Sequence, residues 1–220
     1  MKYTFFFKII MLGMTLMSFP ACNGILDNIY DEPSAEDRAD FGFIEIDKEN
    51  KSGTIYIDAT SYTKWTYIDF HTLTIDSLEI TEGMTEPAEW DIAIHRYDVK
   101  TNGASVIETG FTGLSTLRAS GEIPGGTYIK DEWTTKKIVI DMSGMMEGEL
   151  KYTESFYNTE LSKWLFVDTS SMPPNYNPSN KVYVVKLKDN TVAAVRLKNF
   201  MDASGVKGFM TIEYIYPLEF

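Results

Sequence analysis

Cysteine and histidine are scarce in this 220-residue sequence, and their scarcity excludes several kinds of site. The single cysteine, Cys22, cannot form an intramolecular disulfide or build a cysteine-rich metal site. Histidine occurs only as His71 and His95, so the chain has none after residue 95. Catalysis that depends on imidazole groups therefore has little material here.

Recognisable enzyme motifs and long hydrophobic runs are missing from the body of the chain. The sequence has no glycine-rich phosphate loop and no nucleophile elbow. Beyond residue 22, no apolar run is long enough for a transmembrane helix. We predict that the protein is not an enzyme. A hydrolase built from scattered acidic residues is the weakest alternative, because no spacing supports it.

Positive charge is also in short supply. The formal net charge is -12, and it becomes -14 without residues 1–21, which contain Lys2 and Lys8 but no acidic residue. Phosphate backbones and anionic lipid head groups repel so acidic a chain. The charge therefore argues against nucleic acid as a partner.

The N-terminal segment has the layout of a lipoprotein signal. Lys2 and Lys8 form a basic region, and an apolar run too short to span a bilayer follows from Ile9 to Phe19. Pro20-Ala21-Cys22 then places the lone cysteine at the expected cleavage site. We predict a signal peptide over residues 1–21 and lipidation of Cys22, with the lipid as the only membrane contact. An ordinary cleaved signal with an incidental cysteine is the alternative.

The rest of the chain divides into a short tether and one domain. Residues 22–40 read as an acidic tether, because they have little periodicity and contain Asp27, Asp31, Glu32, Glu36 and Asp37. Residues 41–220 are long enough to bury a core as a single β domain.

The domain is predicted to be all-β. Segments rich in Tyr, Ile, Val, Thr and Phe alternate with Gly, Asn, Asp or Ser, which favours antiparallel strands in sandwich-like layers over a closed barrel. Asp189-Asn190 is a candidate two-residue turn near the end of the chain, where the strand order suggests a meander. No run of helical period is long enough to predict a helix. The expected strands are Phe43–Asp47, Thr54–Ala59, Trp65–Phe70, Leu73–Ile80, Trp90–Val99, Ala104–Thr109, Thr127–Lys130, Lys137–Met142, Glu149–Tyr157, Lys163–Val167, Val182–Lys188, Val192–Lys198 and Phe209–Tyr216.

Two segments read as loops, and both carry methionine. They are Met142–Gly148 and Asp168–Asn180, each of which follows a predicted strand and is rich in turn-forming residues. Loops held by a rigid scaffold are where binding residues tend to lie. Methionine is usually a gap-filler in cores, as expected for Met210, but a core role is harder to assign to Met145 and Met172.

The segment Trp90–Gly103 is the most informative motif. It reads W-D-I-A-I-H-R-Y and later T-N-G, and alternation along one strand places Trp90, Ile92 and Ile94 on the same face. Asn102-Gly103 then supplies residues suited to a tight turn. With the run from Val192 through Tyr214, this motif resembles the HmuY-type haem-binding lipoproteins of anaerobic Gram-negative bacteria.

The resemblance covers most of residues 40–220 and implies an all-β lipoprotein that captures haem outside the cell. The implied partners are haem, an outer-membrane TonB-dependent receptor that takes delivery of it, and host haemoproteins. The implied location is the outer membrane, lipid-anchored at the cell surface, with release to the extracellular space as a further form. The alternative is a β-sandwich surface lipoprotein that binds a protein or a glycan without haem.

The resemblance also suggests the iron ligands. The founding member of the family grips haem iron with two loop histidines, which this sequence lacks, whereas some relatives use methionines instead. The matching loops here make Met145 and Met172 the expected axial ligands, with Met146 and Met142 as alternates for the first.

Other side chains are weaker candidates. His95 reads as a structural histidine and His71 as an exposed one, although a site formed by both stays open. Aromatic residues near the two loops could contact the macrocycle, and hydroxyl or ammonium groups could bind its propionates. The aromatic candidates are Trp133, Tyr152, Trp164, Phe166 and Tyr176, and the propionate candidates are Thr169, Ser170, Ser171 and Lys181.

Overall fold

A computed structural model describes residues 38–220. The predicted signal peptide, the lipidation site Cys22 and all but the last three residues of the predicted tether lie outside the described residues. No helix in the described part of the chain is long and apolar enough to cross a membrane.

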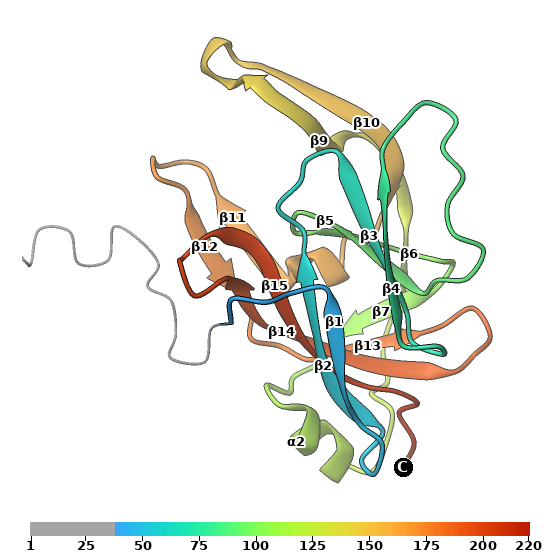
Figure 1. Cartoon of the computed structure of the whole chain (residues 1–220). Coiled ribbons are helices and arrows are strands. Elements are labelled where there is room, and N and C mark those ends of the chain that lie inside the picture. Colours follow the sequence, from blue (N-terminus) through green and yellow to red (C-terminus); the bar gives the residue numbers. More distant parts are fainter. Residues whose placement is uncertain (1–37) are drawn as a thin grey trace, which may run out of the picture. The chain divides into compact units, whose positions relative to one another are not determined.

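The larger of the two main sheets has seven antiparallel strands in the order β1-β2-β15-β14-β13-β7-β8 (Figure 1). The last three strands in the sequence, β13, β14 and β15, are also neighbours in the sheet, which confirms the predicted C-terminal meander. The seven strands are β1 (Phe43–Asp47), β2 (Ser52–Asp58), β7 (Ser105–Glu108), β8 (Ile129–Lys130), β13 (Tyr183–Lys186), β14 (Val192–Met201) and β15 (Lys207–Ile215).

The smaller main sheet has four strands in the order β4-β3-β5-β6, all antiparallel to their neighbours. Its strands are β3 (Lys64–Asp69), β4 (Thr74–Glu79), β5 (Ile92–His95) and β6 (Asp98–Thr101). Strands β3 and β5 are buried almost throughout, because both of their faces are covered.

The main core forms where the two sheets face each other. Ile57 of β2 and Ile212 of β15 belong to the same buried cluster as Ile68 of β3 and Ile94 of β5. Apolar residues at alternate positions of each strand supply this cluster, as the pleat requires. The prediction of sandwich-like antiparallel layers is therefore confirmed.

A short helix on the outer face of the large sheet was not predicted. Helix α2 (Leu114–Ala119) buries Leu117 in a second cluster with Val184, Ala194 and Ile215. A helix of six residues shows too little of the 3.6-residue period to stand out in the sequence.

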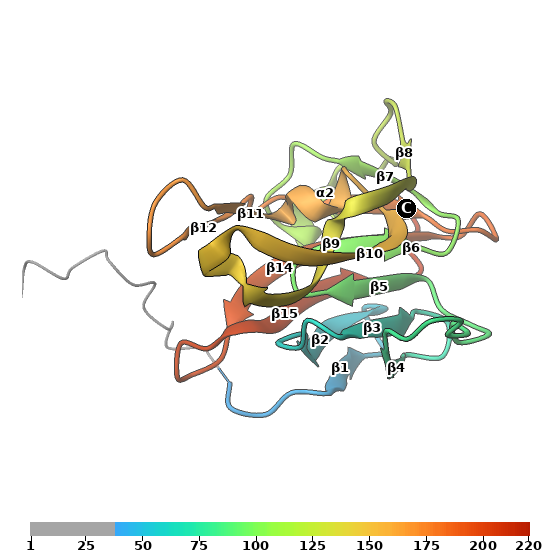
Figure 2. The same ribbon diagram turned by 90° about the horizontal axis from the view of Figure 1, so that it is seen from above.

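Two hairpins extend the domain beyond the main sheets, and both lie toward the same side of it in two perpendicular views (Figures 1 and 2). One joins β9 (Glu132–Gly144) to β10 (Glu149–Tyr157) through a 3-10 turn, η1 (Met145–Glu147). The other joins β11 (Leu165–Asp168) to β12 (Asn175–Pro178), and a second 3-10 turn, η2 (Leu161–Trp164), leads into it. Both predicted loops thus lie at hairpin ends, although each includes some strand.

The prediction of one strand over Trp90–Val99 is wrong. The chain turns at Arg96-Tyr97, where Arg96 has φ +54°, so β5 and β6 form a hairpin with His95 opposite Asp98. The Arg96 guanidinium holds this left-handed conformation by donating to the Thr60 carbonyl and lying 4.5 Å from the Tyr62 ring centroid. Periodicity could not show this turn, because it contains no Gly, Asn, Asp or Pro.

The expected alternation along this segment holds only in part. Ile92 and Ile94 share the main core, but Trp90 precedes the strand and packs with Ala93 in a third cluster. Two turn predictions are confirmed, since Gly103 has φ +73° between β6 and β7 and Asn190 has φ +72° between β13 and β14.

Candidate functional site

The tip of the β9–β10 hairpin presents methionine to solvent. Met145 begins the 3-10 turn with 42% of its surface exposed, and Met146 is 85% exposed. Gly148 closes the turn with φ +79° and donates its N–H to the Met145 carbonyl over 3.1 Å. The chain here needs a residue that tolerates the left-handed region, and glycine provides it.

An ion pair stabilises the base of this tip. The Lys151 ammonium on β10 donates to Asp141 of β9 over 2.8 Å, and Asp141 also accepts the Ser143 N–H. The Lys151 bond is the main reason that the pKa of Asp141 lies far below its ordinary value. The carboxylate therefore stays ionised in mild acid, and the cross-strand contact persists.

The β11–β12 hairpin presents the second predicted ligand. Met172 lies in its connecting loop and is 75% exposed. Side-chain hydrogen bonds hold the loop: Asp168 accepts the Ser170 N–H, and the Ser171 hydroxyl donates to the Pro173 carbonyl. The apolar side chain of Met172 is therefore exposed to water, which is unfavourable unless another group covers it.

The two methionine-bearing tips belong to different two-stranded sheets that do not pair with each other. Both tips lie on the same side of the domain in Figures 1 and 2. Of the two alternates for the first ligand, Met146 is the more exposed, and Met142 is half-buried within β9.

The predicted aromatic contacts divide into accessible and inaccessible groups. Phe166 is 63% exposed, and Trp133 and Tyr152 are also exposed. Trp164 is completely buried and donates its indole N–H to the Tyr97 carbonyl over 2.9 Å, so its prediction as a ligand-stacking residue is wrong. Tyr176 is half-buried, with its ring stacked on Phe200.

Sequence reasoning missed one exposed aromatic residue. Phe156 of β10 lies opposite Trp133 of β9, and their ring centroids are 5.1 Å apart with the rings edge to face. Both residues are more than half exposed. Alternation along the predicted strand Glu149–Tyr157 would place Phe156 on the same face as Tyr152, which was already a candidate, and could have indicated Phe156 too.

The two histidines have separate structural roles. His95 is buried and donates Nε2–H to the Tyr62 carbonyl over 2.8 Å, and burial lowers its pKa to about 4. The imidazole is therefore neutral at pH 7, as expected for a structural histidine. His95 is adjacent to the Trp65 ring at the start of β3, whereas His71 follows the end of β3. This separation rules out a site formed by both histidines.

His71 lies among carboxylates. Its Nε2 is 2.9 Å from Asp189, and its Nδ1 is 3.3 Å from Asp91 and 3.6 Å from Asp69. Asp189, above all, raises the pKa of His71. The ligand atoms of Asp69, His71 and Asp91 lie within 4.8 Å of one another, so these three side chains could also hold a metal ion. The hydrogen bonds connect the β3–β4 turn to the β13–β14 turn.

Comparisons with known proteins bear on the whole domain. The family model described as HmuY protein matches residues 61–214. A solved structure from Bacteroides vulgatus ATCC 8482, described as an HmuY-like heme binding protein, is 64% identical, with a TM-score of 0.78. The alignment covers 82% of this chain and 100% of that one.

Two further solved structures agree. A protein from Bacteroides fragilis NCTC 9343, described as a lipoprotein, is 56% identical, with a TM-score of 0.79, over 85% of this chain and 99% of its own. The apo HmuY analog of Tannerella forsythia is 26% identical, with a TM-score of 0.65, over 74% of this chain and 94% of its own. A comparison with curated protein sequences found no match.

Proposed function

Because this chain belongs to the HmuY family, we propose that it is a haem-binding lipoprotein that holds the iron between Met145 and Met172. The observation that carries the proposal is the pair of hairpin tips on one side of the domain (Figure 1), each of which carries an exposed methionine. The similar protein from Bacteroides vulgatus is described as heme-binding, which supports the same ligand for this chain.

The side chains near the tips are of the kinds that a haem site needs. A haem site needs apolar surface for the macrocycle and two accessible iron ligands. Phe166 on β11 and Tyr152 on β10 supply exposed aromatic surface on the same two hairpins as Met172 and Met145. The charge of -12 opposes an anionic porphyrin at long range, so the propionates need local donors.

Some of the candidate propionate donors already have hydrogen-bond partners in the protein. The Ser171 hydroxyl already donates to Pro173, and the Ser170 N–H already donates to Asp168. The Ser170 side chain also hydrogen-bonds Asp168, whereas the Thr169 side chain lies on an exposed stretch of the same loop. We propose the Thr169 hydroxyl as a propionate donor near Met172, with Lys181 further along the chain.

Two thioether ligands give the site a distinct chemistry. Haem supplies the iron centre, and soft, neutral sulfur favours its ferrous state over the ferric one relative to imidazole. Thioethers have no proton to gain near neutral pH, whereas imidazole ligands compete with protons. We therefore expect binding to strengthen on reduction and to persist in mild acid.

The wider role follows from the same proposal. The chain is anchored to the outer membrane by lipid on Cys22, faces the outside of the cell, and is also released in part. It captures haem, including haem from host haemoproteins, and delivers it to a TonB-dependent receptor. No covalent bond of the haem is made or broken, so the protein acts as a carrier.

A spectral titration tests haem binding itself. Purified protein is mixed with haemin, before and after addition of dithionite, and the visible spectrum is recorded. Sharp low-spin bands after reduction are the expected result. Saturable binding of a protein or a glycan, with no spectral change from haemin in either state, would instead support the alternative function.

A further inference from the structure

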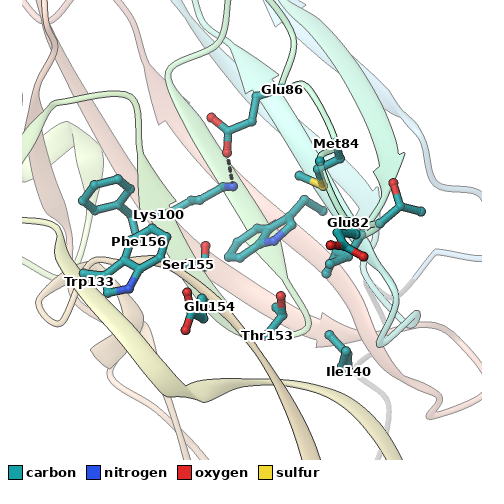
Figure 3. A pocket seen from close by; sticks show the side chains of 14 residues that line it. Glu82, Met84, Glu86, Lys100, Trp133, Ile140, Thr153, Glu154, Ser155 and Phe156 are labelled. Atoms are coloured by element: carbon teal, nitrogen blue, oxygen red, sulfur yellow. Dashed lines mark hydrogen bonds and ion pairs between the residues drawn. The ribbon is translucent and has the colours of Figure 1, made fainter.

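A cavity of about 620 Å³ lies against one face of the β9–β10 hairpin (Figure 3). Strand β3, the loop between β4 and β5, and the β9–β10 hairpin contribute its walls. No residue of the β11–β12 hairpin lines it, and neither does Met145. Its size is within the range of small-molecule sites.

The inner end of the cavity is already filled by a side chain of the protein. The Lys100 ammonium lies 4.3 Å from the Trp65 ring centroid and is ion-paired with Glu86 (Figure 3). It also lies 5.2 Å from the Tyr67 ring and 5.5 Å from the Trp90 ring. The rings of Trp65, Tyr67 and Trp90 therefore already contact a cationic group of the protein. A ligand has to occupy the outer part of the cavity.

The outer part offers two more aromatic rings. Trp133 and Phe156 line the cavity from the β9–β10 hairpin, and both are more than half exposed. Their edge-to-face arrangement leaves ring faces accessible to solvent. Within residues 38–220, no cationic side chain lies over either ring. Such faces attract an organic cation through the ring quadrupole.

The charge of the cavity also favours a cation. Three carboxylates, Glu82, Glu86 and Glu154, line it against one ammonium, that of Lys100. Glu86 is paired with Lys100, whereas Glu82 and Glu154 form no ion pair with other described residues. An anion, including a porphyrin with two propionates, would be repelled here. Met84 packs against the buried cluster that contains Trp65, and it adds apolar surface to the cavity wall.

We propose that this cavity binds a small organic cation that carries an apolar group. Its positive charge lies against the carboxylates of Glu82 and Glu154, and its apolar part lies against the rings of Trp133 and Phe156. None of the predicted iron ligands lines the cavity, so the proposal does not depend on Met145 or Met172, although Trp133 was also a candidate for contact with the macrocycle.

The test uses benzyltrimethylammonium as the probe and isothermal titration calorimetry as the readout. Benzyl alcohol is the neutral control and benzoate is the anionic one. We expect saturable binding of the cation, binding of the alcohol at least about fivefold weaker, and no binding of benzoate. Higher salt should weaken cation binding, because the carboxylates are near the surface.

Matched variants locate the site. We expect E154Q and W133L each to weaken cation binding about threefold to fivefold. Their controls, E149Q on the same strand and F166L on β11, alter exposed residues that do not line the cavity and should change it by less than about twofold. Circular dichroism checks that each variant is folded. Equal binding of the alcohol, equal effects of the control variants, or no saturable binding of the cation would overturn the proposal.

Discussion

The ion pair between Lys100 and Glu86 predicts an unusual asymmetry in stability. The Lys100 side chain is 4% exposed, whereas that of Glu86 is 41% exposed. Removing the charge of Glu86 leaves a buried ammonium without its counter-ion, but removing Lys100 leaves a carboxylate that water can solvate. The two variants E86Q and K100M should therefore differ in their cost.

The magnitudes follow from this geometry. Breaking a buried ion pair by removing one partner costs about 3–5 kcal/mol, and screening at the exposed Glu86 reduces the expected loss in E86Q to about 1.5–3 kcal/mol. K100M keeps most of the apolar stem and removes a buried charge, so its loss should be about 0–1 kcal/mol. The double variant should be close to K100M, because nothing is left unpaired in the interior.

The pH dependence gives an independent check. Burial lowers the pKa of Lys100 from its ordinary value of 10.5, and loss of the Glu86 charge should lower it further. Between the folded and unfolded pKa values the unfolded chain binds more protons, so stability rises with pH there. The difference in the free energy of unfolding between E86Q and the wild type should therefore become smaller in alkaline solution.

Urea unfolding followed by tryptophan fluorescence measures these differences. With an m value of about 2 kcal/mol/M, E86Q should lower the midpoint by about 1 M at pH 7, and K100M by much less. The reasoning is refuted if K100M is the more destabilised variant, or if the E86Q deficit stays the same at alkaline pH.

Three further predictions concern the histidines and the hairpins. In proton NMR, one histidine should titrate above 6.5 and be shifted down by D189N, because Asp189 raises the pKa of His71, while His95 should titrate at about 4. The stability contributed by His71 is complete below about pH 6.5 and is lost as pH rises through its raised pKa, so D189N should cost more at pH 5.5 than at pH 8.5 in urea unfolding. W164A should lower the free energy of unfolding by about 3–5 kcal/mol, since it empties a fully buried site, whereas M172A should change it by less than about 0.5 kcal/mol. A single histidine midpoint, a cost of D189N that does not vary with pH, or equal costs for W164A and M172A would contradict these expectations.

The sequence predicted the layers of this fold better than its turns. Alternating apolar residues mark strands such as β2 and β15 because each buries one face in the main core. The turn at Arg96-Tyr97 depends on contacts to Thr60 and Tyr62, which lie more than thirty positions away. Local patterns carry no record of such contacts, so the β5–β6 hairpin was read as one strand.

The sequence predicted the two exposed methionines of the candidate site, but not the burial of a nearby aromatic residue. Glycine and proline around Met145 and Met172 indicated loops, and both residues are exposed at hairpin ends. The burial of Trp164 could not be foreseen, since η2 turns it inward to donate to Tyr97. The cavity at Trp133 and Phe156 also depends on packing of the β9–β10 hairpin against a distant loop.

The central claim is that Met145 and Met172 are the two ligands of haem iron. The most direct measurement is a haem titration of M145A and M172A under dithionite, followed at the Soret band. M146A is the matched control, because Met146 is the neighbour of Met145 and the most exposed methionine among residues 38–220. We predict that M145A and M172A each weaken binding at least about tenfold and lose the low-spin bands, while M146A keeps both. Unchanged spectra and affinity in M145A and M172A would contradict the account.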